Sequence, residues 1–82
     1  MIIDMEELKN LILEAAEKAE PSGGLQVDEV LFGEGSRLAL DSIDALQISM
    51  AIQKRYGVRL NDSKETRRAM GSITLLAAFL SQ

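Results

Sequence analysis

The chain has 82 residues and a formal net charge of −4, with 46% hydrophobic and 27% charged residues. This predicts one soluble domain with its own core, residues 1–82. The absence of cysteine and histidine excludes disulfides, thiolate or imidazole metal sites, and catalysis by a Ser-His-Asp triad or a cysteine nucleophile. We therefore expect a protein that is not an enzyme and holds no metal.

Charge and hydropathy also argue against two classes of partner, nucleic acids and membranes. Residues 1–36 hold nine acidic and two basic residues, and residues 37–82 hold four acidic and seven basic ones. The acidic total argues against nucleic acid as a partner. The N-terminus lacks the basic start and apolar run of a secretion signal, and no apolar run is long enough to cross a membrane. We expect a cytoplasmic protein without membrane insertion.

A first helix is predicted over residues 4–19. Lys18 lies in its expected last turn, where a cation suits the helix dipole, and Pro21 followed by Ser22-Gly23-Gly24 is expected to end it. Apolar residues recur at three- and four-residue steps and form one stripe. These residues are Leu8, Leu11, Ile12 and Ala15.

No periodicity persists over residues 20–40, where Gly33 and Gly35 argue against a long helix. A connection of this length in a compact domain is usually functional or disordered. Apolar side chains along it favour an ordered loop that packs on the core and contains one short helical turn. These anchors are Leu25, Val27, Val30, Leu31 and Phe32.

A second helix is predicted from Asp41 to about residue 56. Asp41 is a good N-cap, Asp44 completes a weak capping box, and Gly57 suits the position after the helix. Two apolar stripes run side by side along it. One consists of Ala45, Ile48, Ile52 and Tyr56, and the other of Ile43, Leu46 and Met50.

Residues 58–60 are expected to be extended, and Asn61 or Asp62 to cap a short third helix that ends near residue 69. A last helix is predicted over residues 73–80, after a break at Gly71 and Ser72. It is apolar nearly all round, so we expect it in the core and as part of the wall of a pocket, with a dimer contact as the alternative to a monomer.

The predicted fold is all-α: a small four-helix bundle with a long loop between helices 1 and 2 and a short third helix. The expected core members are Leu8, Leu11, Ile12, Leu31, Ile48, Ala51, Ile52, Tyr56, Val58, Leu60, Ile73 and Leu76.

The segment with the most chemical information is the start of the second helix. If Asp41 is the N-cap, the hydroxyl of Ser42 is not needed for capping and can point to solvent. The first N–H groups of a helix lack partners within it, so a phosphate on that hydroxyl would lie in a favourable field. However, Asp-Ser at a helix start is common, and on spacing alone a plain cap remains the better interpretation.

The chain as a whole resembles the acyl carrier protein family, whose signature is an Asp-Ser-Leu-like tripeptide that opens the second of four helices. The resemblance extends from the first helix to Leu80. It depends on Asp41-Ser42-Ile43-Asp44, on Tyr56-Gly57-Val58, and on the preceding Leu31-Phe32-Gly33-Glu34-Gly35-Ser36.

This resemblance implies that Ser42 carries a covalent 4′-phosphopantetheine arm, which a phosphopantetheinyl transferase adds from coenzyme A. The arm would hold acyl groups as thioesters for acyl-loading, synthase and acyltransferase enzymes of fatty acid, lipid or polyketide-type biosynthesis. The resemblance also assigns partner recognition to residues around the serine. These are Asp41, Ile43, Asp44, Leu46, Gln47 and Met50.

The chain departs from the family in its charges. Bacterial members of fatty acid synthesis usually carry several glutamates along the second helix, where this chain has Gln47, Gln53, Lys54 and Arg55. The third helix carries Lys64, Arg67 and Arg68. Just before Asp41-Ser42, where the family often has glycine, this chain has Leu40 preceded by Ala39. We therefore expect a specialised carrier with a less basic partner surface. The alternatives are a peptidyl or aminoacyl carrier domain and an unmodified helical adaptor.

Overall fold

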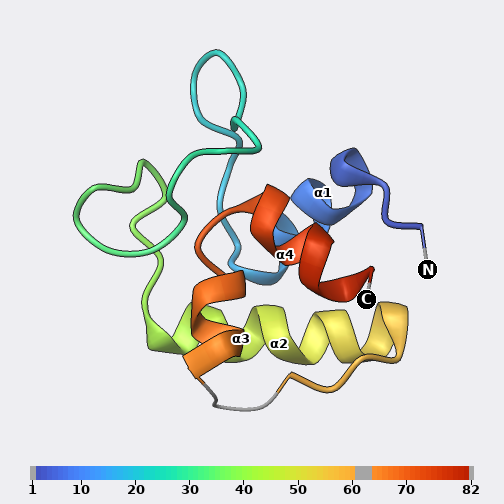
Figure 1. The fold of residues 1–82 in the computed structure, drawn as a ribbon. Helices are drawn as coiled ribbons and strands as arrows, with labels where there is room; N and C mark the ends of the chain where they lie inside the picture. Colours follow the sequence, from blue (N-terminus) through green and yellow to red (C-terminus); the bar gives the residue numbers. More distant parts are fainter. Residues whose placement is uncertain (1, 61–63, 82) are drawn as a thin grey trace.

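The computed structural model describes residues 2–60 and 64–81. Within them the chain forms four helices, α1 (Met5–Ala15), α2 (Ser42–Tyr56), α3 (Lys64–Ala69) and α4 (Ile73–Leu80), and no β-strand. Helix α1 packs on α2 and α4, and α3 packs on α4. Figure 1 shows the long connection between α1 and α2 at the end of the molecule opposite the two termini. The all-α fold with a long first loop and a short third helix is confirmed.

Helix α1 ends about four residues earlier than predicted. The N–H of Lys18 donates to the carbonyl of Leu13 (2.9 Å), and that of Glu17 donates to the carbonyl of Glu14 (3.1 Å). These two bonds form a Schellman motif, with Glu17 in the left-handed region at φ 56°. The helix therefore ends at Ala15, and the placement of Lys18 in its last turn was wrong.

The other helix boundaries agree with the prediction wherever they are described. Helix α2 begins after Asp41 and ends at Tyr56, and its C-cap Gly57 adopts a left-handed φ of 73°. Helix α4 begins after Ser72, whose Oγ accepts from the N–H of Leu75 (3.2 Å). The predicted caps of α3, Asn61 and Asp62, lie outside the described residues. No helix in the described part of the chain is long and apolar enough to span a bilayer.

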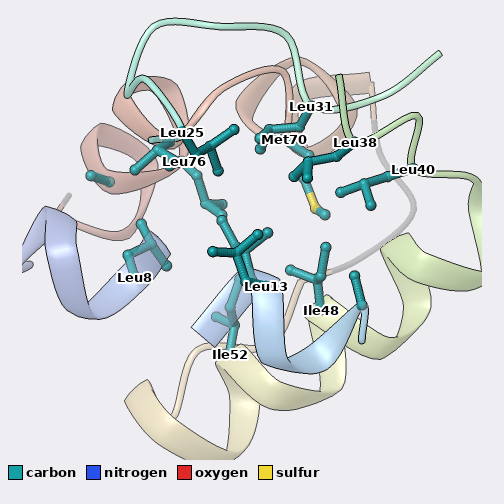
Figure 2. Packing of buried hydrophobic residues seen from close by; sticks show 14 of the residues in the cluster. Leu8, Leu13, Leu25, Leu31, Leu38, Leu40, Ile48, Ile52, Met70 and Leu76 are labelled. Atoms are coloured by element: carbon teal, nitrogen blue, oxygen red, sulfur yellow. The ribbon is translucent and has the colours of Figure 1, made fainter. Parts of the chain in front are cut away.

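The core lies between the helices and the long connection (Figure 2). All seven of the largest fully buried side chains were predicted to be core residues. They are Leu8, Ile12, Leu31, Ile48, Ile52, Ile73 and Leu76. The other five predicted residues are only partly buried: Leu11, Ala51, Tyr56, Val58 and Leu60.

The connection between α1 and α2, residues 16–41, is ordered by burial and by hydrogen bonds to the start of α4. Leu25, Leu31, Leu38 and Leu40 enter the core from it. The N–H of Leu31 donates to the carbonyl of Gly71 (3.2 Å). The expectation of an ordered, packed loop is therefore confirmed. The helical turn expected within residues 20–40 is present only as isolated hydrogen-bonded turns, such as the one closed by the N–H of Glu29 and the carbonyl of Gln26 (3.4 Å).

Two of the predicted loop anchors were wrong. Val27 and Val30 are 37% and 52% exposed. Val27 still holds the loop in place, because its carbonyl accepts from the N–H (3.0 Å) and the hydroxyl (3.1 Å) of Thr74. The backbone of the loop, and not only its apolar side chains, therefore fixes the position of the loop on α4.

Arg37 clamps the outer part of the connection. Its guanidinium donates to both carboxylate oxygens of Glu29 (2.9 and 2.6 Å) and to the carbonyls of Ser22 (2.8 Å) and Gly24 (2.7 Å). The Arg37 guanidinium, together with the N–H of Gln26, lowers the pKa of Glu29 from 4.5 to about 2. The carboxylate is therefore ionised at neutral pH, and the loop is held by a charged, bidentate contact.

This pair predicts a pH dependence of stability. Because the pKa of Glu29 is lower in the folded chain than its ordinary 4.5, its contribution is fully present above about pH 4.5 and is lost as the pH falls toward 2. We expect Glu29→Gln to make the fall of Tm over this pH range shallower than in the wild type, as measured by circular dichroism. Glu34→Gln, which removes an exposed loop carboxylate, is the control. Parallel Tm curves for wild type and Glu29→Gln would contradict the clamp.

Candidate functional site

The segment before Ser42 is organised around a buried serine. The Oγ of Ser36 donates to the carbonyl of Leu31 (2.8 Å) and accepts from the N–H groups of Leu38 and Ala39 (3.1 Å each). The N–H of Leu40 also donates to the carbonyl of Leu31 (3.2 Å), beside an isolated parallel bridge between residues 32 and 40. The chain thus folds back on itself immediately before α2, and this fixes where the helix starts.

Ala39 in this segment adopts a left-handed φ of 48°. An L-residue there carries a steric cost of about 1–2 kcal/mol in the folded state. Glycine would remove this cost, but it would also increase the conformational entropy of the unfolded chain, which offsets part of the gain in stability. We expect Ala39→Gly to raise the free energy of unfolding by about 0.5–1 kcal/mol in urea denaturation. The control is Ala78→Gly, inside α4, which should lower it by about 1 kcal/mol. A loss of stability in Ala39→Gly would contradict the prediction.

Asp41 and Asp44 form a complete capping box at the start of α2. The Oδ1 of Asp41 accepts from the N–H groups of Ile43 and Asp44 (3.0 Å each), and Oδ2 of Asp44 accepts from the N–H of Asp41 (3.0 Å). Ser42 is the first helical residue and is exposed. Since Asp41 is the cap, the hydroxyl of Ser42 is left for other chemistry.

The prediction that N–H groups without partners give a favourable electrostatic field at the start of α2 needs one correction. The expected N–H groups without partners are largely used: those of Ile43 and Asp44 donate to the Asp41 carboxylate, and that of Asp41 donates to the Asp44 carboxylate (3.0 Å). The N–H of Asp44 is the main cause that lowers the pKa of Asp41. A charged carboxylate therefore already occupies the positive end of α2.

A cavity of about 750 Å³ opens beside Ser42. Its lining comes from the long connection, from α2, from α3 and from the chain on both sides of α3. Most of it is apolar: Val30, Phe32, Ala45, Leu46, Leu60 and Met70. The polar side chains that line it are Ser42, Ser49, Thr66 and Arg67. No residue of α4 lines this cavity, so the expected part of α4 in the pocket wall was wrong.

Helix α4 instead turns most of its apolar side chains into the core. Ile73, Leu76, Ala77 and Leu80 are buried, and Leu75 is 48% exposed. The apolar character of this helix is therefore explained by packing on α1 and α3.

The residues expected to contact partners lie on different sides of α2. Ile43, Leu46 and Met50 are 67%, 60% and 59% exposed, which is unusual for side chains of their size. Leu46 reaches the cavity beside Ser42. Gln47 lies in a separate groove between α1 and α2.

Sequence reasoning missed most of the cavity. Val30 was predicted to anchor the long loop on the core, Thr66 and Ser49 were not singled out, and Arg67 was noted only as one of three basic residues. The signal that was present is the charge of α3, where Lys64, Arg67 and Arg68 are all exposed. Of these three, only Arg67 lines the cavity.

A family model described as phosphopantetheine attachment site matches residues 6–64, which is 59 of the 82 residues. The match includes all of α1 except Met5, the whole connection and α2. No curated protein and no solved structure matches the chain.

Proposed function

Because the chain belongs to the family of phosphopantetheine attachment domains, which carry a covalent 4′-phosphopantetheine arm, we propose that it is an acyl carrier protein with the arm on Ser42. Residues 1–82 would form the carrier domain. The proposed function is to present acyl groups, as thioesters of the arm, to enzymes of fatty acid, lipid or polyketide-type biosynthesis. The protein itself would supply binding and orientation, and the thiol of the arm would supply the chemistry.

One observation supports this assignment most strongly. The hydroxyl of Ser42 is exposed at the first position of α2 and is not consumed as the helix cap, because Asp41 fills that role. It also borders an apolar cavity of a size that suits a small-molecule ligand. An exposed hydroxyl beside an apolar cavity fits an arm whose far end carries an apolar group.

Loading is a transfer of a phosphoryl-bearing group from coenzyme A. The Ser42 oxygen would form a bond to the phosphorus that bears pantetheine, and the pyrophosphate P–O bond of coenzyme A would break. Adenosine 3′,5′-bisphosphate would leave, and the hydroxyl proton would pass to a base of the phosphopantetheinyl transferase. This chain has no histidine and need supply only the oxygen.

The exposed stripe of Ile43, Leu46 and Met50 supports a role in partner binding. A row of large apolar side chains more than half exposed on one helix marks an interaction surface in a small protein. We propose that acyl-loading, synthase and acyltransferase enzymes dock on this stripe next to the arm, with Asp41 and Gln47 at its margins. Asp44 is half-buried and tied into the capping box, so its part in recognition would be indirect.

The test is to load the purified protein. It is incubated with coenzyme A and a broad-specificity phosphopantetheinyl transferase, and the intact mass is then measured. We expect a gain of one phosphopantetheinyl group, located by peptide mapping on the peptide that contains Ser42. An unchanged mass would favour an unmodified helical adaptor, and a modification on another peptide would contradict the assigned site. Loading by an amino-acid-activating enzyme, and not by acyl-loading enzymes, would favour a peptidyl or aminoacyl carrier.

A further inference from the structure

The proposed phosphodiester would be placed beside existing negative charge. It would hang from Ser42, which follows Asp41 in the chain and is two residues before Asp44. The Asp41 carboxylate has its pKa lowered and already accepts the N–H groups of Ile43 and Asp44. A second anion at this helix start cannot use those donors, so a cation from another element would stabilise it.

The cavity beside Ser42 provides such a cation. Arg67, on α3, is the one basic residue among the described residues that line the cavity, and Ser42 lines it too. Arg67 is exposed, so its guanidinium can reach an anion without being desolvated. It also takes part in an interaction within the protein, but a guanidinium has five N–H donors in a planar fork and can serve two partners at once.

We propose that Arg67 forms an anion subsite at the cavity beside Ser42, and that its ligand is the phosphodiester of the arm. This inference rests on the proposed function, because it requires the arm on Ser42. Guanidinium and phosphate oxygens match in charge and geometry. The contact would hold the first part of the arm on the α3 side of Ser42, over the cavity, and would thereby favour entry of the cargo between α2 and α3.

The matched control is the neighbouring Arg68. It is exposed on the same short helix and has the same charge, but it does not line the cavity. Arg67→Gln and Arg68→Gln therefore change the net charge equally, but only Arg67→Gln removes a guanidinium that lines the cavity. Each variant is prepared without and with the arm, and the mass of each loaded sample is checked. The quantity compared is the Tm of each variant with the arm minus its Tm without the arm. Both samples of Arg67→Gln lack the existing Arg67 interaction, so its loss cancels in this difference.

We expect this difference to be lower in Arg67→Gln than in wild type by about 2–4 °C, the size of an exposed ion pair in a domain of this length. Arg68→Gln should match the wild type. The contrast should vanish in 1 M NaCl, where the screening length is about 3 Å. The ³¹P resonance of the phosphodiester should also shift in Arg67→Gln and stay unchanged in Arg68→Gln.

Three results would overturn the subsite. The first is an equal effect of the two substitutions, which would indicate general charge and not a contact. The second is no effect of either, which would leave the phosphodiester in solvent. The third concerns samples whose arm is loaded with a succinyl or a butyryl group. If Arg67→Gln lowers the Tm difference only with the succinyl group, the ligand of Arg67 is the carboxylate of the cargo and not the phosphodiester. A protein that gains no mass would contradict the proposed function itself, which separates the two failures.

Discussion

Replacing Ser42 with alanine is expected to abolish loading by a phosphopantetheinyl transferase while leaving the fold as stable as before. The hydroxyl is the only atom group lost, and it lies exposed at the first position of α2. Alanine is the better helix former by about 0.5 kcal/mol or less, so the free energy of unfolding should change by less than about 0.5 kcal/mol. The two measurements are intact mass after incubation with coenzyme A and urea denaturation of the unloaded protein.

The stability measurement separates the carrier from the plain-cap interpretation of the same serine. If Ser42 were the N-cap, the alanine variant would lose about 1 kcal/mol. Ser49→Ala is the matched control for loading, because Ser49 lines the same cavity but lies two turns further along α2. We expect Ser49→Ala to load as the wild type does. Mass gain in Ser42→Ala, or its loss in Ser49→Ala, would contradict the assignment.

Helix α2 could be predicted almost to the residue because its signals are local. Asp41 caps it with its own side chain, Gly57 ends it in the left-handed region, and the spacing of Ile48 and Ile52 defines the buried face. None of these features depends on distant parts of the chain. The same local signals predicted that Ser42 is the first helical residue and that its hydroxyl is not needed for capping.

The end of α1 could not be predicted in this way. Its Schellman motif uses Glu17 in the left-handed region, where sequence patterns expect glycine or asparagine. The strained residue is retained by the chain that follows: Glu20 accepts from the N–H of Leu25 (3.1 Å) and from Nζ of Lys9 (2.7 Å), which draws the loop back onto α1. The stop is thus decided by contacts made beyond it.

The cavity was missed for a related reason. Its walls come from segments that are far apart in the sequence, with Phe32, Leu46 and Met70 among them. Each of these residues reads as an ordinary core or surface position when its own segment is considered alone. The charge of α3 was visible in the sequence, but only the packing of α3 on α4 distinguishes Arg67 from Arg68.

The long connection is where distant contacts matter most, and Leu31 is the residue to test. Leu31 is 1% exposed in the core. Its N–H donates to Gly71, and its carbonyl accepts from the N–H of Leu40 and the hydroxyl of Ser36. Leu31→Ala would leave a cavity at the point where the loop, α4 and the lead-in to Ser42 meet. We expect it to lower the free energy of unfolding by about 3–4 kcal/mol, within the usual range for a buried leucine.

Val30→Ala is the matched control, because it removes a neighbouring apolar side chain that is 52% exposed. It should cost less than about 1 kcal/mol. Small domains have only about 5–15 kcal/mol of stability in total, so the Leu31 variant should lose a large part of it, with a fall in Tm of roughly 10–25 °C by calorimetry. Similar losses in the two variants would mean that the loop is held by its exposed contacts, such as the Arg37 clamp, and not by the side chain that it inserts into the core.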